Sequence, residues 1–282
     1  MIQIGPYTVS LVKTGEFRLD GGAMFGVVPK TLWSKTNPSD ELNRIEMIAQ
    51  CLLIESPDRK ILVDAGIGSK EQEKFNKVFS VDNSRYSFET SLTEKKIDPG
   101  EITDLIYTHL HFDHAGGSTK SAGNDVIPTF ENATHYVQKS QYEHALTRCE
   151  RDRASYIDHN YVPIKEAGRM EMIEGDTELF PGVHLLTSSG HSPGMQTVLV
   201  TDGNKSVWFP ADLIPLASQL HLPYIMGYDL FPLTTLEDKR RYLARACDEE
   251  WIVAFEHDPY CDACSLQRDA KGRVVKKDDI VL

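Results

Sequence analysis

The chain has 282 residues, 40% of them hydrophobic, and a formal net charge of −12. This length and apolar content are enough for a large buried core, and no Pro/Ser-rich linker, low-complexity stretch or repeat divides the chain. The acidic balance argues against a nucleic-acid partner, because phosphate binding needs a basic surface. No signal-peptide pattern and no run of 18 apolar residues occur, so we expect a soluble, cytoplasmic protein with no membrane partner.

The five cysteines are odd in number and mostly scattered, which is not typical of a secreted disulfide framework. Cys261 and Cys264 form a C-x-x-C pair. No second pair accompanies them, so the sequence favours incidental thiols over a redox or metal site.

Short apolar runs separated by turn residues predict the strands, and amphipathic patterns predict the helices. The first strands are expected at 3–13, 47–54 and 60–63, and a helix follows at 85–96. Further strands are expected at 103–107, 135–138, 183–187, 197–201, 207–209 and 251–255, with helices at 140–151 and 235–248. Strands interleaved with single helices predict an α/β protein with two sheets packed face to face and helices outside. We expect one domain over residues 1–282, with a helical insertion at about 139–174.

The most informative segment is Thr-His-Leu-His-Phe-Asp-His-Ala-Gly-Gly at residues 108–117. His109, His111 and His114 would point in different directions on a helix, so the pattern predicts a loop whose side chains converge. Gly116 and Gly117 let the chain bend after it. Three imidazoles and the carboxylate of Asp113 within six residues predict a metal site.

Three later residues stand where apolar runs end and could complete this site. They are His191 in a Gly-His-Ser-Pro-Gly turn, Asp212 in Pro-Ala-Asp, and His257 in Phe-Glu-His-Asp-Pro. Five histidines and two aspartates exceed the needs of one tetrahedral ion. The set predicts two divalent cations, with Zn²⁺ favoured and Fe²⁺, Mn²⁺ or Co²⁺ left open.

The remaining histidines have weaker claims to a ligand role. His135 and His184 lie in apolar runs and are expected to be strand residues with ordinary partners, whereas His144 and His159 are expected to face solvent.

An apolar stretch near the N-terminus contains Met24, Phe25 and Trp33 but is broken by Gly22, Gly26 and Pro29. It predicts either a wall that receives an acyl chain or a ring, or a loop packed on the core.

In its motifs and their order, the chain resembles the metallo-β-lactamase superfamily. The stretch from Asp20 to Lys30, followed by Leu32-Trp33-Ser34, resembles the N-terminal signature of the quorum-quenching lactonase branch, to which methyl parathion hydrolases are related. The resemblance implies a four-layer αββα sandwich with the metals at one edge of the sheets. It also assigns roles: His109, His111 and His191 to one metal, Asp113, His114 and His257 to the other, Asp212 as the bridge, and Asp64 as a support for the ligands.

The resemblance implies a hydrolase in which a metal-bridging hydroxide attacks a small-molecule substrate while Asp113 or Asp212 carries the proton. The leading expectation is a lactonase acting on N-acyl homoserine lactones. An ester or phosphotriester hydrolase, a glyoxalase II-like thioesterase and a non-catalytic metal-binding scaffold are the alternatives. Phe25, Trp33, His221 and Tyr224 are the expected substrate contacts.

One position departs from known acyl-homoserine lactonases, which carry a tyrosine three positions after the bridging aspartate, where this chain has Pro215. Tyr224 or Tyr228 could supply that hydroxyl. A homodimer formed through an apolar face of the insertion is also left open.

Overall fold

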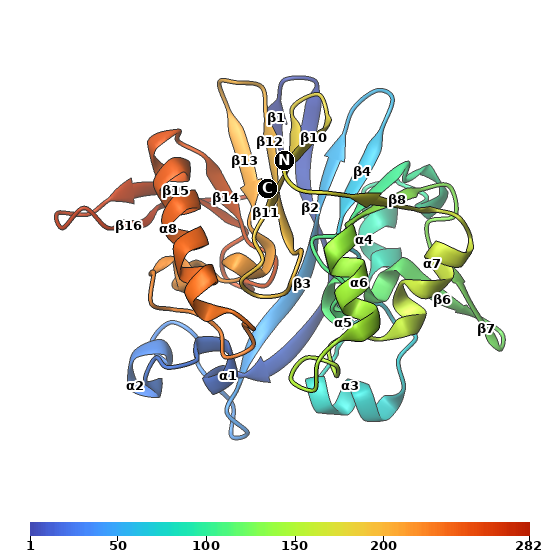
Figure 1. The fold of residues 1–282 in the computed structure, drawn as a ribbon, viewed down its shortest axis with the longest axis horizontal. Coiled ribbons are helices and arrows are strands. Elements are labelled where there is room, and N and C mark those ends of the chain that lie inside the picture. Colours follow the sequence, from blue (N-terminus) through green and yellow to red (C-terminus); the bar gives the residue numbers. More distant parts are fainter. The chain divides into compact units, whose positions relative to one another are not determined.

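A computed structural model describes all 282 residues. It contains two seven-stranded sheets and one two-stranded sheet (Figure 1). The first large sheet has the strand order β1-β2-β3-β4-β5-β8-β9, and the second runs from β10 to β16 in sequence order. Both are mixed: β4 pairs parallel with β5 but antiparallel with β3, and β13 pairs parallel with β14 but antiparallel with β12.

The strands of the first large sheet are β1 (Ile2–Ile4), β2 (Tyr7–Asp20), β3 (Arg44–Glu55), β4 (Lys60–Val63), β5 (Asp104–Ile106), β8 (Thr134–Gln138) and β9 (Met170–Ile173). Those of the second are β10 (Thr177–Phe180), β11 (Val183–Thr187), β12 (Gln196–Thr201), β13 (Ser206–Phe209), β14 (Ile252–Ala254), β15 (Ala263–Arg268) and β16 (Val274–Ile280). The small sheet is the hairpin of β6 (Thr119–Ala122) and β7 (Asp125–Pro128).

The α-helices are α1 (Gly21–Phe25), α2 (Lys30–Trp33), α3 (Glu73–Phe79), α4 (Phe88–Glu94), α5 (Phe112–Ala115), α6 (Lys139–Thr147), α7 (Val162–Glu166) and α8 (Pro232–Asp248). Short 3₁₀ turns occupy Pro99–Glu101, Gly116–Ser118, Asp158–Asn160, Ala211–Leu213 and Ala217–Leu220. Helices flank both mixed sheets, which confirms the predicted αββα class of fold.

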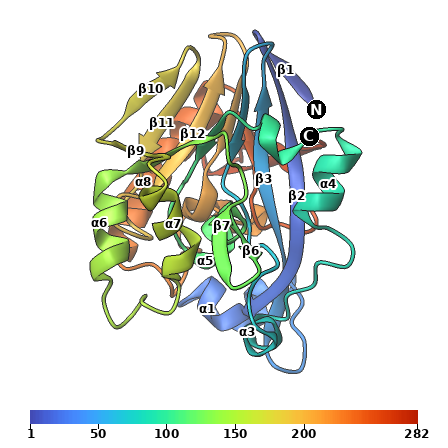
Figure 2. The same cartoon turned by 90° about the vertical axis from the view of Figure 1, so that its right-hand side faces the viewer.

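The chain divides into two compact units. Unit 1 comprises Met1–Gly5, Arg18–Met47 and Gly175–Leu282, and unit 2 comprises Pro6–Phe17 and Ile48–Glu174. In unit 1, α8 packs on a core that includes Trp208 and Trp251. In unit 2, α4, α6 and α7 surround a core built on β4, β5 and β8, and the β6–β7 hairpin lies beside α7 (Figure 2).

Most predicted elements are present. The strands predicted at 60–63 and 183–187 match β4 and β11 residue for residue, and α8 starts three residues before the predicted helix, with Pro232 in its first turn. The strand β16 was not predicted, because its central residues Lys276 to Asp279 are charged and such residues are depleted in strands. Residues 139–174 contain α6, α7 and β9, and the boundaries of an insertion there stay a prediction.

No helix of the structure combines the length and the apolar character that crossing a lipid bilayer requires.

Candidate metal centre

The first group of predicted ligands lies in unit 2, immediately after the buried strand β5. His109 and His111 stand on the connecting segment, as predicted for a loop. Asp113 and His114, however, lie on the one-turn helix α5, which has His111 at its N-cap. The prediction of a loop throughout was therefore wrong for the second half of the motif, because four residues are enough to close one helical turn.

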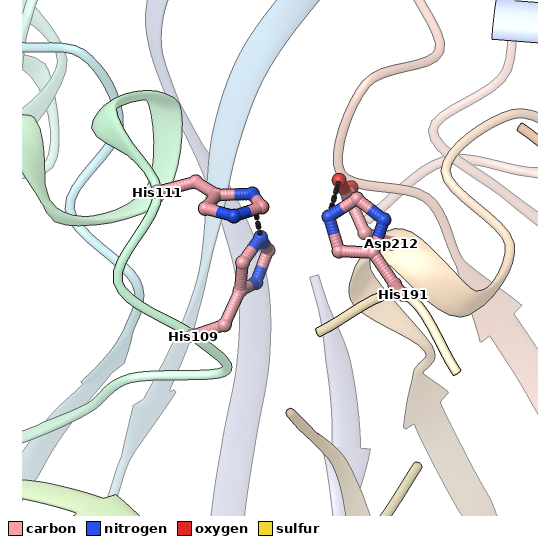
Figure 3. A group of neighbouring side chains, drawn as sticks. All are labelled: His109, His111, His191 and Asp212. Carbon is pink, nitrogen blue, oxygen red and sulfur yellow. Dashed lines mark hydrogen bonds and ion pairs between the residues drawn. The ribbon is translucent and has the colours of Figure 1, made fainter. Parts of the chain in front are cut away.

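The side chains of this group converge and are buried. His109 Nε2 lies 3.0 Å from His111 Nδ1 (Figure 3), and His114 Nε2 lies 3.8 Å from Asp113 Oδ1. All four residues are less than 8% exposed. Unit 2 thus presents three imidazoles and one carboxylate in one small region.

Asp64 supports this group from the end of β4. Its backbone has a φ of 60°, and its carboxylate accepts hydrogen bonds from Thr108 N at 2.8 Å and from His114 Nδ1 at 3.1 Å. Occupying Nδ1 with a carboxylate fixes the imidazole ring and leaves Nε2 for a metal, which is the usual arrangement around metal-binding histidines.

The two glycines that end the motif are needed for close packing. A Cβ on Gly116 would lie 2.0 Å from Ile67 O, and one on Gly117 would lie 2.1 Å from Ala65 O. Gly116 itself has the ordinary helical φ of −56°. The predicted role in bending is therefore secondary to the room these glycines leave for residues 65–67.

Residues 139–174 support the ligand segment within unit 2. His111 forms a β-bridge with Tyr156, and their rings meet edge to face at 4.6 Å between centroids. The Tyr156 hydroxyl donates to Gln141 Oε1 at 3.1 Å, and Leu110 N donates to the same oxygen at 3.4 Å. This segment therefore helps to hold His111, a role that the sequence did not indicate.

The second group of predicted ligands lies in unit 1. His191 follows β11, Asp212 follows β13 and His257 follows β14. His191 Nε2 lies 3.2 Å from Asp212 Oδ2 (Figure 3), and His257 Nε2 lies 3.3 Å from Asp212 Oδ1. The Asp212 carboxylate thus faces one imidazole with each oxygen, and all three residues are buried.

Asp229 is a functional residue that the sequence analysis missed. Its Oδ1 lies 2.9 Å from His191 Nδ1, and its Oδ2 accepts a hydrogen bond from Thr235 Oγ1 at 2.7 Å. Asp229 fixes His191 as Asp64 fixes His114, with Nε2 directed away. It lies in an irregular loop, so no periodicity or spacing marks it in the sequence.

Local backbone strain accompanies the second group. Ala211, the residue before Asp212, has a φ of 48°, which is uncommon for a residue with a Cβ. A Cβ on Gly190, the residue before His191, would lie 2.4 Å from Thr235 N. Both ligands are thus held by tight, specific turns.

The four predicted substrate contacts form one aromatic cluster in unit 1. Phe25 and Trp33 stack at 5.3 Å, Tyr224 meets Phe25 edge to face at 6.0 Å, and His221 lies 5.3 Å from Tyr224. Phe25 and Trp33 are at most 1% exposed, so their rings pack in the core, as the second of the two interpretations predicted. The exposed apolar side chains of that stretch are Val27 and Leu32. Contact with substrate stays a prediction for all four residues.

Other residues with possible chemistry have ordinary surroundings. His144 and His159 were expected to face solvent; the His159 side chain is 42% exposed and that of His144 is 17% exposed, and they pair with Glu71 and Asp152, each at 2.6 Å. Cys261 and Cys264 are free thiols. Burial raises the pKa of Cys261 well above its ordinary value and that of Cys264 to about 12, which disfavours the reactive thiolate.

The donor chemistry fits divalent metals of the zinc type. Several buried carboxylates placed together need a compensating positive charge. Asp64 and Asp229 hold the Nδ1 atoms of His114 and His191, which directs the Nε2 atoms of these imidazoles toward a metal. Nitrogen and oxygen ligands of this kind suit Zn²⁺ and its neighbours.

A family model described as "Metallo-beta-lactamase superfamily" matches residues 45–257, which include all seven predicted ligands. The chain belongs to the metallo-β-lactamase superfamily. It is therefore a hydrolase of that superfamily with a His/Asp metal site, and its αββα fold is the superfamily's fold.

Within the superfamily, the chain is similar to lactonases. An N-acyl homoserine lactonase from Bacillus thuringiensis is 31% identical over 221 residues, which cover 74% of this chain and 80% of that protein. A solved structure of a probable metal-dependent hydrolase from Staphylococcus aureus is 28% identical, with a TM-score of 0.89 and 99% and 100% coverage. An N-acyl homoserine lactone hydrolase with N-hexanoyl-L-homoserine bound at its catalytic metal centre is 25% identical, with a TM-score of 0.68 and 89% and 93% coverage.

Proposed function

We propose that the five histidines and two aspartates hold two divalent metal ions, with Zn²⁺ preferred, and that the protein opens the ring of N-acyl homoserine lactones. The observation that carries this proposal is the similarity to an N-acyl homoserine lactonase over 74% of the chain, combined with a complete set of five histidines and two aspartates. A decayed, non-catalytic scaffold would be expected to have lost some of these ligands.

Metals bound by these residues would lower the pKa of water and polarise the lactone carbonyl. The protein's own part is to place and hold the groups that meet the substrate. Asp64 and Asp229 fix the imidazoles of His114 and His191, so that little reorganisation is needed during the reaction.

The two carboxylates in the ligand groups are the candidates for proton transfer. Ring opening breaks the ester C–O bond, and the departing alkoxide must gain a proton. Asp113 and Asp212 have the right chemistry to take a proton from the attacking water and pass it to that oxygen.

The deciding experiment measures metal content and kcat/KM on the same preparations. The substrates are short- and long-chain homoserine lactones, an aryl ester, methyl parathion and a glutathione thioester. We expect two metals per chain and a preference for the lactones, with metal and turnover both lost in Asp212→Ala. His184→Ala, a histidine of β11 outside both groups, is the matched control and should retain both.

A second candidate is an ester or phosphotriester hydrolase. Pro215 favours it, because the acyl-homoserine lactonases that the chain resembles carry a tyrosine at this position. If the ester, phosphotriester or thioester is turned over faster than the lactones, the metal-dependent mechanism stands but the proposed substrate is replaced. Fewer than one metal per chain and no turnover of any substrate would contradict the enzyme proposal itself.

A further inference from the structure

Unit 1 contains a cavity of about 590 Å³ whose lining includes His221 and Tyr224, two of the four expected substrate contacts. It lies between the loop 220–224, helix α8 and the β15–β16 hairpin, and the last two are labelled at the left of Figure 1. None of the seven metal ligands lines it. Its volume is in the range of pockets that bind small molecules.

The walls of this cavity combine apolar surface with positive charge. Its apolar side chains include Leu220, Leu222, Leu243, Ala244 and Val274. Three guanidinium groups, from Arg240, Arg268 and Arg273, also line it, and no acidic side chain does. A ligand that fits these walls has an apolar body and a negative head.

Each of the three arginines has one carboxylate partner outside the lining of the cavity. Arg268 pairs with Asp248 at 2.7 Å and Arg273 with Asp269 at 2.6 Å, while Arg240 pairs with Glu237. A guanidinium has five N–H donors and one carboxylate engages two of them at most, so donors remain for a ligand. The existing partners also reduce the net charge, which suits a head with one negative charge rather than two.

A buried lysine holds the loop that forms one wall of the cavity. Lys239 is fully buried beneath the loop, where its Nζ donates to the carbonyls of Gln219, His221 and Tyr224 at 2.7 to 2.8 Å. Burial lowers the pKa of His221, and the charges of Arg273 and Lys239 lower it further. Burial also lowers the pKa of Lys239 to about 7, so the positive charge at the cavity comes from the three arginines.

We propose that this cavity binds an amphipathic monocarboxylate, with the carboxylate at the arginines and the apolar tail along the leucines and Val274. Free fatty acids have this chemistry, and so do ring-opened N-acyl homoserines. The proposal does not depend on the lactonase activity, because none of the residues that carry it is a metal ligand.

The test is calorimetric titration of the metal-loaded protein with dodecanoate, with N-decanoyl-homoserine and, as a cationic control, with dodecyltrimethylammonium. We expect both carboxylates to saturate a site that persists in Asp212→Ala, and the cation to bind at none. The double variant Arg268→Gln/Arg273→Gln should bind about 10-fold more weakly or worse, because charge-assisted hydrogen bonds are lost. Arg241→Gln, on α8 but outside the cavity, is the matched control and should bind normally.

Two further variants distinguish binding in this cavity from binding at the metals. Ala244→Trp fills the cavity without changing its charge and should also weaken binding. Asp212→Ala removes a metal ligand and should leave binding intact. Whichever of dodecanoate and N-decanoyl-homoserine binds more tightly identifies the class of ligand, a fatty acid or a ring-opened N-acyl homoserine. Tighter binding of either one supports the site.

Three results would overturn the proposal. Loss of binding in Asp212→Ala would place the carboxylate at the metals. Unchanged binding in both cavity variants, or binding of the cation as tight as that of the carboxylates, would also contradict the site. Failure of the protein to hydrolyse lactones would leave the carboxylate titration unaffected, so the two proposals fail separately.

Discussion

At the scale of single residues, the site depends on carboxylates that hold imidazoles. Asp229 contacts His191 Nδ1 at 2.9 Å, and both side chains are buried. We expect Asp229→Ala to lower metal affinity about 10- to 100-fold, because the imidazole loses its fixed orientation and its N–H is left without an acceptor. Competition against a chromogenic chelator measures this affinity. Asp176→Ala, an aspartate of unit 1 that accepts from Thr187, should have no effect, and a wild-type affinity in Asp229→Ala would show that the contact is dispensable.

A second single residue, His135, makes the stability of the fold depend on pH. It is fully buried in β8, and burial lowers its pKa to about 4 from the ordinary 6.5. Between these values the unfolded chain binds a proton that the folded chain does not, so stability falls as the pH drops from 6.5 to 4. The expected loss is on the order of 3 kcal/mol.

Urea unfolding of the metal-free protein across this pH window tests the assignment. His135→Phe should flatten the pH dependence. His184→Phe, which replaces a half-buried histidine of β11, is the control and should retain it. A wild-type slope in His135→Phe would assign the effect to other groups.

At the scale of elements, residues 139–174 act through Tyr156 on the first ligand group. Tyr156 bridges His111 and donates to Gln141. We expect Tyr156→Ala to lower metal affinity by about 10-fold or more, since His111 loses its packing partner, and Tyr156→Phe to cost less, since only the hydroxyl is lost. Tyr142→Phe, on α6 in the same segment, is the control. Equal metal affinity in all three variants would mean that the segment does not support the site.

The elements also show why some predictions succeeded. The ligand motifs were found because each follows a short apolar strand: β5 and β13 are fully buried, β14 is mostly buried, and β11 alternates in burial over its first three residues. The hairpin β15–β16 was missed because charged residues fill its outer strand. Arg268 and Arg273 of this hairpin line the proposed carboxylate cavity, so the sequence analysis overlooked that cavity as well.

At the scale of the whole molecule, metal and stability should be linked. Ligands that bind only the folded chain stabilise it, by about 2.7 kcal/mol at a free concentration of 100 times Kd. We expect a chelator to lower the Tm and added Zn²⁺ to restore it, as followed by scanning calorimetry. In Asp212→Ala the chelator should change the Tm much less, and an identical shift in that variant would locate the stabilising metal elsewhere.

The whole chain also marks the limit of what the sequence could predict. The family, the fold class and seven candidate ligands follow from sequence motifs. A metal site requires histidine and aspartate side chains, and in this chain these residues stand where apolar strands end. Asp229 does not, because a loop carboxylate becomes a support only where the chain folds back on His191. For Phe25 and Trp33 the sequence left open a substrate-receiving wall and a loop packed on the core, and the structure places both rings in the core.

The division of the ligands between two units has a consequence for biosynthesis. Asp64 and the ligands from His109 to His114 belong to unit 2, whereas His191, Asp212 and His257 belong to unit 1. A ribosome adds ~5–20 residues per second, so several seconds separate the synthesis of His114 from that of His191. The nascent chain therefore displays three imidazoles and two carboxylates to the cell's metal pool before the later ligands exist, and the choice of the first ion can be made during translation.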